Sequence, residues 1–326
     1  MKKRIVSGMR PTGKMHLGHL HGALDNWKRL QNDYECFFFI ADWHALTSEY
    51  ADTGIIKESI FDIIIDWVSI GLDPQESTFF IQSGIQEHTE LHLVFSMITP
   101  LPWLERNPTY KEQLRELTQK DLYTYGFLGY PVLQAADILM YKANGVPVGE
   151  DQAPHVELTR EIARRFNHLY KEVFPEPATL LAPTSKLLGI DRRKMSKSYN
   201  NAIFLTDSDN EISAKIGQMI TDPQRARRSD PGNPEVCNVF SFHEIYRPAE
   251  GVKQIDEDCR GAKIGCVECK KIMAGNLCTA LEPIRDKRRE LESDINRVRD
   301  IIDNGNTRAK SIAMETMSQV KEAIGI

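Results

Sequence analysis

The sequence predicts a doubly wound α/β fold, in which a parallel sheet is covered by helices on both faces, followed by a mostly helical domain. Two observations support this prediction. Short apolar runs of strand length alternate with segments of helical period in the first part of the chain. After about residue 190 the alternation stops, and long charged segments of helical period follow. The length of 326 residues is enough for about two domains.

Four short apolar runs are expected to form buried parallel strands: 4–8, 36–41, 78–82 and 145–148. Between and after them, apolar residues recur at helical spacing, which predicts helices at 17–31, 56–71, 87–98, 131–142 and 151–170. A Pro/Gly/Asn-rich segment then precedes two long charged helices, expected at 283–302 and 307–324. These patterns divide the chain into domains 1–189 and 190–326.

The composition excludes several classes of protein. With 41% hydrophobic and 27% charged residues, the chain is neither disordered throughout nor collagen-like. No apolar run approaches the roughly 20 residues of a membrane helix, and residues 1–8 lack the apolar stretch of a secretory signal. A net charge of −5 argues against a protein that is basic throughout, but not against local basic patches. We therefore expect a soluble, cytoplasmic protein.

A histidine motif, His16-Leu17-Gly18-His19, follows the first expected strand and begins the first helix. Ligands bind at this position in a doubly wound sheet, where strand carboxyl ends face helix N-termini. The two histidines are three residues apart and share a helix face, so both imidazoles can donate hydrogen bonds to phosphate oxygens. They would stabilise transition-state charge electrostatically. The alternative is a pair of surface histidines; metal binding is disfavoured because the nearby sequence offers no further ligands at usable spacing.

A basic motif, Lys194-Met195-Ser196-Lys197-Ser198, lies at the expected end of the sheet domain. Two lysines separated by methionine and serine can hold a polyphosphate as mobile point charges and close when a nucleotide binds. The alternative interpretation of a basic run is a solvated surface. Occurring together, the two motifs are highly specific.

The two motifs resemble the paired signatures of class I aminoacyl-tRNA synthetases. The small size and the internal segments 41–45, 129–139 and 146–152 resemble the tyrosyl/tryptophanyl branch, and the bacterial tryptophanyl-tRNA synthetases in particular. This resemblance implies a Rossmann-like catalytic domain, a helical anticodon-binding domain and a homodimer. It also implies tryptophan–tRNA ligase activity: ATP, with Mg²⁺, activates L-tryptophan to tryptophanyl-adenylate, pyrophosphate leaves, and the amino acid passes to the 3′ terminal ribose of tRNA(Trp).

The resemblance further implies roles for individual residues. The expected catalytic residues are His16, His19, Lys194 and Lys197. The expected ATP contacts are Arg10, Pro11, Thr12, Gly18, His19, Gly149, Glu150, Asp151, Leu187, Lys194, Met195, Ser196, Lys197 and Ser198. The expected tryptophan pocket comprises Val6, His44, Tyr130, Asp137, Val146, Val148 and Gln152.

Asp137 is the residue expected to select the side chain of the amino acid. Indole has one hydrogen-bond donor and no acceptor, so a buried carboxylate is a fitting partner. Phenylalanine would be rejected because the carboxylate would be left buried and unpaired. A tyrosine hydroxyl would pair with it equally well, so this residue does not separate the two sister activities. The alternative for Asp137 itself is a solvent-facing position on an amphipathic helix.

Four of the six cysteines form a cluster with the pattern C-x21-C-x6-C-x2-C: Cys237, Cys259, Cys266 and Cys269. Four thiolates suit either a [4Fe–4S] cluster or structural Zn²⁺. Only one C-x2-C pair is present, which favours the iron–sulfur cluster over a zinc ribbon, and some members of the resembled family carry such a cluster at a similar pattern. Zinc and free thiols remain alternatives. Cys36 and Cys278 are interpreted as bystanders.

Basic residues surround these cysteines: Arg225, Arg227, Arg228, Arg260, Lys263, Lys270 and Lys271. They could contact tRNA phosphates, or they could simply offset the anionic thiolates on a solvated face. Three competing functions remain open at this point. They are a tyrosyl-tRNA synthetase, a small-molecule nucleotidyltransferase with the same histidine motif, and a non-catalytic RNA-binding or iron–sulfur sensor protein that has a synthetase fold.

Overall fold

The computed structural model describes residues 2–116, 121–182 and 187–326, with only the backbone described at Glu116 and Ser198. The chain forms two compact units. Unit 1 comprises Met1–Gly13, Asp25–Pro183 and Leu291–Ile326, and unit 2 comprises Lys14–Leu24 and Thr184–Glu290. The division expected from the sequence was two contiguous domains, 1–189 and 190–326. The observed units differ from it in two ways: the segment with the histidine motif belongs to unit 2, and the C-terminal helix belongs to unit 1.

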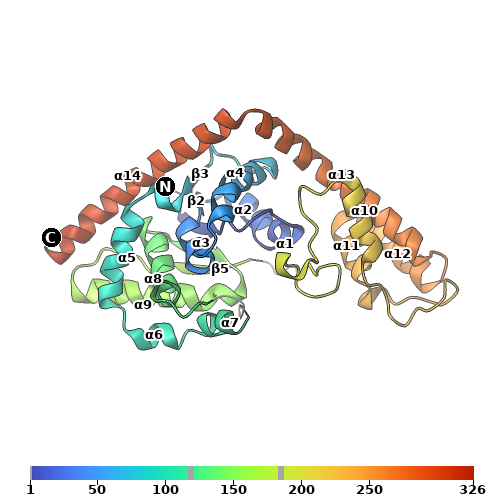
Figure 1. Ribbon diagram of the computed structural model, residues 1–326, viewed down its shortest axis with the longest axis horizontal. Coiled ribbons are helices and arrows are strands. Elements are labelled where there is room, and N and C mark those ends of the chain that lie inside the picture. The colour runs from blue at the N-terminus through green and yellow to red at the C-terminus, as the bar shows by residue number, and fades with distance from the viewer. Residues whose placement is uncertain (1, 117–120, 183–186) are drawn as a thin grey trace. The chain divides into compact units, whose positions relative to one another are not determined.

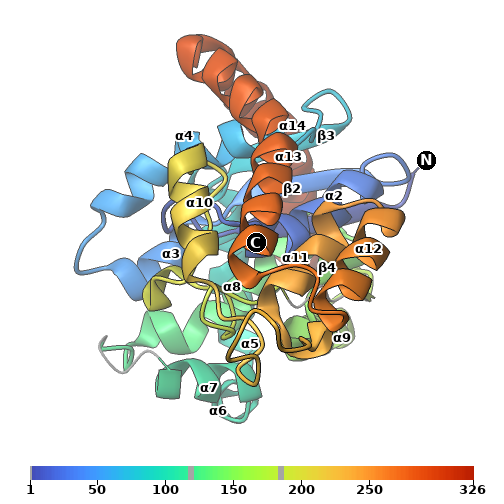
Figure 2. The same ribbon diagram turned by 90° about the vertical axis from the view of Figure 1, so that its right-hand side faces the viewer.

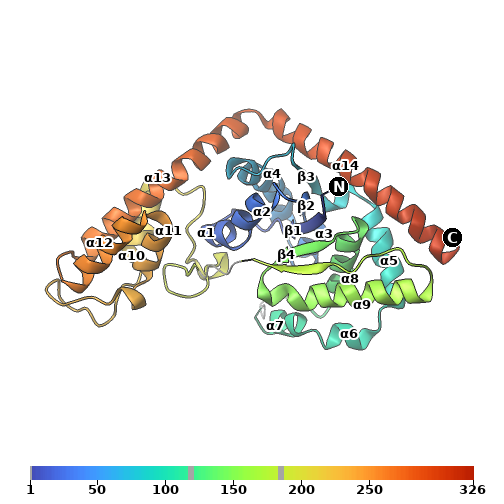
Figure 3. The same cartoon turned by 180° about the vertical axis from the view of Figure 1, so that it is seen from behind.

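Unit 1 is built on a five-stranded, fully parallel sheet of strand order β3-β2-β1-β4-β5. The strands are β1 Arg4–Met9, β2 Glu35–Ile40, β3 Ser77–Ile81, β4 Gly145–Val148 and β5 Ala178–Leu181. Figure 3 shows β1 between β2 and β4, where the strand order reverses. Ligands bind at such a reversal, beyond the carboxyl ends of the strands. The predicted fold class and its four strands are confirmed, and β5 is an additional strand.

The helices of unit 1 in the described part of the chain are (Figure 1): α2 Asp25–Leu30, α3 Asp42–Glu49, α4 Gly54–Ser69, α5 Glu87–Ile98, α6 Leu101–Glu105, α7 Pro108–Glu116, α8 Tyr125–Met140, α9 Ala153–Leu169 and α14 Ile295–Ile324. Helix α8 packs between α5 and α9, and the apolar run of β2 is almost fully buried, as a strand covered on both faces requires. The predicted helix 131–142 begins earlier, because Thr124 caps it by accepting a hydrogen bond from the backbone N–H of Phe127.

The C-terminal helix α14 lies along β3, an edge strand of the sheet (Figure 1). The Oδ1 atom of Asn306 accepts a hydrogen bond from the backbone N–H of Ile81 at 3.0 Å, which satisfies a donor that an edge strand leaves open. A Cβ at Gly305 would lie 1.6 Å from the carbonyl oxygen of Phe79, so only glycine permits this approach. The sequence-based break between 302 and 307 was therefore wrong; the helices separate at Asp294, which caps α14.

Unit 2 contains the short helix α1 Leu17–His19, its π-helical continuation η1 Leu20–Leu24, and four longer helices: α10 Asp209–Gln218, α11 Asn238–Tyr246, α12 Ala249–Arg260 and most of α13 Cys266–Ser293. Helices α11 and α12 pack against each other (Figure 2). Backbone hydrogen bonds join Leu17 to Ile203 and Leu205 to Met15 at 3.0 Å each, which explains why the histidine segment belongs to this unit. Among the described helices of the chain, none has the length and apolar character needed to cross a membrane.

Candidate active site

The side chains of the two motif histidines both accept backbone hydrogen bonds at the start of α1. His16 is the N-cap residue, and its Nδ1 accepts from the backbone N–H of Gly18 at 3.1 Å. The Nδ1 of His19 in turn accepts from the backbone N–H of His16 at 3.1 Å. Each side chain thus satisfies a backbone donor at the helix start, in the reciprocal arrangement of a capping box. The two rings lie 3.8 Å apart between centroids.

This capping determines which ring nitrogens carry protons. Burial, reinforced by the nearby charge of Lys197, lowers the pKa of His16 to about 4. Burial, His16 and Lys197 lower the pKa of His19 well below its usual value. Both imidazoles are therefore neutral near pH 7. Because each Nδ1 is an acceptor, each Nε2 carries the proton and is a donor. Two such donors suit phosphate oxygens, as the spacing predicts.

The basic motif lies in a loop that is organised by Asn201, a buried residue. Its Oδ1 accepts from the backbone N–H of Ser196 at 2.8 Å, and its Nδ2 donates to the carbonyl of Lys194 at 3.1 Å. The same Nδ2 also donates to Oδ1 of Asp191 at 2.7 Å. A single buried amide therefore fixes the backbone that presents the lysines. Sequence reasoning missed this residue because it lies just outside the motif.

Other predicted members of the phosphate site lie in the same unit. Met195 is buried, and a Cβ built at Gly18 would lie 3.5 Å from the Cβ of Met195. Leu187 is buried as well, and Lys194 is exposed. The side chain of Ser198 lies outside the described part of the structure. Unit 2 thus brings His16, Gly18, His19, Met195 and Lys197 together.

The remaining predicted ATP contacts belong to unit 1. Nη2 of Arg10 donates to Oγ of Ser48 and lies 3.8 Å from Oε1 of Glu49. Burial lowers the pKa of Arg10, while Glu49 and Tyr130 partly offset the effect. Nε of Arg10 is shielded from solvent and has no hydrogen-bond partner among the described residues. A partnerless buried donor is costly unless water or a ligand supplies an acceptor, so the site suits an anion. Pro11 is buried beside it, and the backbone N–H of Thr12 turns back to the Arg10 carbonyl at 2.9 Å.

Residues 149–152 form a tight turn after β4. Gly149 precedes the 3-10 turn Glu150–Gln152, and a Cβ at Gly149 would lie 2.6 Å from Oδ1 of Asp151. Nε2 of Gln152 donates to Oδ2 of Asp151 at 3.0 Å. The structure therefore directs the predicted tryptophan contact Gln152 towards Asp151.

Asp137, on α8, is the centre of a buried hydrogen-bond network. Its Oδ1 accepts from Nε2 of Gln82 at 2.8 Å and from Nδ1 of His88 at 2.6 Å. Its Oδ2 accepts from Nε2 of His44 at 2.7 Å. The other ring nitrogen of His88 lies 2.7 Å from the hydroxyl of Tyr141. The alternative of a solvent-facing Asp137 is excluded, since this residue has no exposed surface.

The network keeps the Asp137 carboxyl ionised. Burial by itself would raise the pKa of this group, but hydrogen bonds from His44 and His88 outweigh burial and lower the pKa below its usual value. An ionised carboxylate only accepts hydrogen bonds, which matches a ligand that only donates. Sequence reasoning identified Asp137 and His44 but missed Gln82, His88 and Tyr141. The position of Gln82, directly after a strand, is a signal that could have identified it.

The predicted pocket walls all belong to unit 1. Val6 and Val146, on neighbouring strands, are buried in the main apolar core, and Val148 packs against that core. Tyr130 is on the same helix as Asp137, and its ring centroid lies 6.5 Å from that of His44. Tyr130 is buried, and burial raises the pKa of its hydroxyl well above its usual value in spite of the nearby Arg10 cation.

The four clustered cysteines come from three elements of unit 2: the start of α11, the end of α12 and the first turn of α13. Burial raises the pKa of Cys269 to about 12, together with the proximity of Cys237, Cys259 and Cys266. Nη1 of Arg225 lies 3.8 Å from Sγ of Cys259 and 3.9 Å from Sγ of Cys266.

None of the six cysteines, all of which lie in the described part of the chain, takes part in a disulfide bond. Within residues 2–116, 121–182 and 187–326, no three His, Cys, Asp or Glu side chains are arranged so that they could hold a metal ion. The ligand set Cys237, Cys259, Cys266 and Cys269 is therefore gathered in one region but not confirmed as a metal site. It stays a prediction.

Comparisons with known proteins agree with this geometry. Residues 1–282 match the family described as tRNA synthetases class I (W and Y). The chain is 54% identical to the tryptophan–tRNA ligase of Thermotoga maritima and 48% identical to that of Aquifex aeolicus. Each alignment covers 99% of this chain and at least 99% of the relative. In structure it is similar to the tryptophanyl-tRNA synthetase of Campylobacter jejuni complexed with ADP and tryptophan, at a TM-score of 0.92 and 32% identity. That match covers 99% of this chain and 100% of the other.

Proposed function

Because the chain belongs to the class I tRNA synthetases of the tryptophan and tyrosine group, we propose that it is a tryptophan–tRNA ligase. The observation that carries the choice of tryptophan is full-length identity of 40–54% to tryptophan–tRNA ligases. The buried, ionised Asp137 offers the acceptor that an indole N–H needs, but it would serve a tyrosine hydroxyl equally well, so the choice of tryptophan rests on the relatives. A tRNA ligase must be in the same compartment as its tRNA substrate, which is the cytoplasm, so we expect a cytoplasmic protein.

The proposed reaction has two steps. The tryptophan carboxylate attacks the α-phosphorus of ATP in line, which releases pyrophosphate and forms tryptophanyl-adenylate. A 3′ terminal ribose hydroxyl of tRNA(Trp) then attacks the activated carbonyl and releases AMP. No protein nucleophile is required, so positioning and charge stabilisation provide the rate enhancement. The Nε2–H donors of His16 and His19 and the cations of Lys194 and Lys197 would bind the phosphate oxygens, with Mg²⁺ sharing the phosphate charge.

Amino-acid-dependent exchange of pyrophosphate into ATP, measured with each of the twenty amino acids, tests this function. We expect exchange with tryptophan alone. Exchange with tyrosine would identify the sister activity, and an absence of exchange with every amino acid would favour the non-catalytic sensor. Asp137→Asn is the informative variant, because loss of the carboxylate should weaken the preference for tryptophan over phenylalanine.

We also infer that the protein is a homodimer. Support comes from exposed apolar side chains on the adjacent helices α5 and α6: Leu93 is 55% exposed, Met97 74% and Leu101 57%. A large exposed apolar patch is unfavourable in an isolated monomer. Light scattering should give twice the monomer mass of 37.2 kDa, and Met97→Glu should shift it to the monomer mass. A wild-type mass of one monomer would refute the dimer.

For the cysteine cluster we infer a [4Fe–4S] cluster, with Zn²⁺ as the alternative. The chemistry of the donor set suits either group, since four thiols come from one region and Arg225 adds a cation beside two of them, although the described side chains are not arranged around a metal position. A bound cluster would act structurally, holding α11, α12 and α13 together near basic residues suited to tRNA phosphates. Iron, sulfide and zinc analysis of anaerobically purified protein decides between the two metals, and an absence of all three would leave free thiols.

A further inference from the structure

Tyr130 is linked to a chain of buried polar side chains that the proposed reaction does not use. Its hydroxyl lies 3.0 Å from Nε2 of His155, and Nδ1 of His155 lies 3.0 Å from Nδ2 of Asn107. His155 has no exposed surface, and Asn107 and Tyr130 are 5% and 7% exposed. The three residues come from separate parts of unit 1: the loop before α7, the first turn of α9, and α8.

The orientation of the Asn107 amide is determined by the backbone. Its Oδ1 accepts from the backbone N–H of Thr109 at 3.0 Å and of Tyr110 at 3.4 Å. Since the oxygen faces two donors, the amide nitrogen faces His155. An amide nitrogen only donates hydrogen bonds, so Nδ1 of His155 must accept.

His155 is therefore a neutral imidazole with its proton on Nε2. Burial, together with the charge of His44, lowers the pKa of His155 to about 4, while Asp151 opposes the shift only in part. With Nδ1 accepting, Nε2 carries the single proton and donates it to the oxygen of Tyr130. The hydroxyl proton of Tyr130 cannot point back at this N–H. It is left as a donor for another group, with one lone pair still available.

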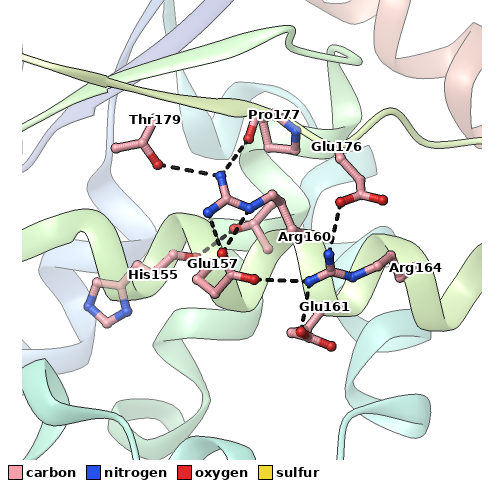
Figure 4. Close-up of polar contacts among 9 residues, drawn as sticks. His155, Glu157, Arg160, Glu161, Arg164, Glu176, Pro177 and Thr179 are labelled. Carbon is pink, nitrogen blue, oxygen red and sulfur yellow. Dashed lines mark hydrogen bonds and ion pairs between the residues drawn. The ribbon is translucent and has the colours of Figure 1, made fainter.

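Asn107, His155 and Tyr130 form what we call the relay. Helix α9, which carries His155, makes polar contacts with the segment that follows it (Figure 4). Beyond the turn that carries His155, Arg160 donates to the carbonyl of Pro177 at 3.0 Å. Arg164 pairs with Glu176 at 3.0 Å and with Glu157 at 2.9 Å, as Figure 4 shows. These contacts tie α9 to the chain that leads into the edge strand β5.

Two relationships show which end of a bound amino acid Tyr130 would meet. Tyr130 and Asp137 are seven residues apart on α8, two helical turns or about 10.5 Å along the axis, and share a face. An amino acid that places its side chain on Asp137 and its backbone groups towards the start of α8 would meet Tyr130. Arg10, a predicted ATP contact, lies close enough to Tyr130 for their charges to interact. The carboxylate of the amino acid reacts with ATP, so it must lie near the predicted ATP contacts. Arg10 is one of these contacts, and it lies near Tyr130.

We propose that Asn107 and His155 are positioning residues that turn the Tyr130 hydroxyl towards the amino acid, where it donates to the carboxylate and accepts from the ammonium group. This proposal rests on the proposed function for the identity of the ligand. The orientation of the hydroxyl itself depends only on the three side chains. Tyr130 thereby recognises the zwitterion in addition to forming an apolar wall of the pocket.

The tautomer of His155 can be measured in the wild-type protein, and a variant is needed only to assign its signal. In protein labelled with ¹⁵N-histidine, the two ring nitrogens have different chemical shifts when one is protonated and the other is not, and His155→Gln identifies the signal. We expect the proton on Nε2 at pH 8. A proton on Nδ1 in the wild-type protein would overturn the proposal, whatever reaction the protein catalyses.

A double-mutant cycle tests the consequence for binding. Asn107→Asp replaces the donor with an acceptor, which moves the His155 proton to Nδ1 and turns the Tyr130 proton towards His155. The KM for tryptophan in pyrophosphate exchange should rise about tenfold, with a smaller change in kcat. Tyr130→Phe should raise the KM for tryptophan by a similar factor, and the double variant should show no further increase in this KM. Asn296→Asp, the same change at an exposed position of α14, is the control.

Additive effects of Asn107→Asp and Tyr130→Phe would refute the relay, because independent residues do not share one hydrogen bond. A wild-type protein with no tryptophan-dependent exchange would refute the proposed function and the role in zwitterion binding together. The tautomer measurement would still report on the relay in that case, so the two failures are distinguishable.

Discussion

Nδ1 of His88 lies 2.6 Å from Oδ1 of Asp137, and both side chains are buried. This contact gives the two carboxylate oxygens different roles. Oδ1 is held from inside the protein by His88 and Gln82, whereas the partner of Oδ2 is His44, whose side chain is 11% exposed. Oδ2 is therefore the oxygen that a bound indole N–H would reach. His88 fixes the orientation of that acceptor without facing the ligand.

Replacing His88 should weaken both stability and tryptophan binding. His88→Leu removes one hydrogen bond from Asp137 and leaves the Tyr141 hydroxyl without its ring partner, which should cost about 1–3 kcal/mol of unfolding free energy. The KM for tryptophan should rise about tenfold. Urea denaturation and pyrophosphate exchange measure the two effects.

The matched control is His92→Leu, one helical turn further along α5. Nδ1 of His92 is buried without a hydrogen-bond partner among the described residues, so its removal should cost little stability. An equal loss of stability in both variants would contradict the specific role of His88.

The stability of the protein should depend on pH through Asp137. The pKa of this carboxyl is lower in the folded protein than its usual 3.8, so the unfolded chain binds the proton more readily. The resulting stabilisation is fully present above the unfolded pKa and is lost as the pH falls through the folded pKa. The difference in unfolding free energy between the wild type and Asp137→Asn should therefore shrink from about pH 5 downwards. A difference that stays constant from pH 6 to pH 3 would contradict this prediction.

The cation of Lys197 should act directly on the histidine motif. Burial is the larger cause of the lowered pKa of His16, and the charge of Lys197 adds to it. Lys197→Met removes that charge, so the pKa should rise above 4 but stay below 6.5. A proton NMR titration of the His16 ring measures the shift. Lys194→Met, the corresponding change three residues earlier, should leave the pKa near 4. The same shift in both variants would point to a general charge effect and not to the position of Lys197.

Asn201 should control the order of the basic loop. Asn201→Ala removes its hydrogen bonds to Ser196, Lys194 and Asp191, which should reduce the unfolding free energy by about 1–3 kcal/mol. Trypsin should then cleave faster after Lys194 and Lys197, and the KM for ATP should rise. Asn210→Ala, at an exposed position of α10, is the control. Unchanged cleavage in the Asn201 variant would show that the loop is ordered by other contacts.

Loss of one clustered cysteine should separate the two steps of the reaction. Cys266→Ser should reduce the affinity for the proposed metal group at least as much as the roughly 10–100-fold that follows loss of a residue hydrogen-bonded to a metal ligand. The rate of tRNA aminoacylation should fall as the metal group is lost, while the rate of pyrophosphate exchange should remain nearly unchanged. Cys278→Ser, the same change at a cysteine outside the cluster, should affect neither activity. Equal loss of both activities in Cys266→Ser would refute a role confined to tRNA.

Local sequence patterns accounted for most of the sheet because each central strand is an apolar run buried on both faces. β5 was missed, since Ala178–Leu181 is an edge strand that is half exposed and shows no such run. The end of α13 was also misplaced. Gly305 and Asn306 suggest a break in isolation, but they are the residues that let α14 approach β3 and complete its edge.

The sequence by itself determined the fold class and the positions of the two motifs that we expect to bind nucleotide, because these depend on residue type and spacing along the chain. The role expected of Asp137 came from the family resemblance. Only the tertiary structure decided which groups surround them. Gln82 and His88 reach Asp137 across separations of 55 and 49 residues, and Asn107 reaches His155 across 48. Protonation states and tautomers follow from such distant contacts, since burial and hydrogen-bond partners are set by packing.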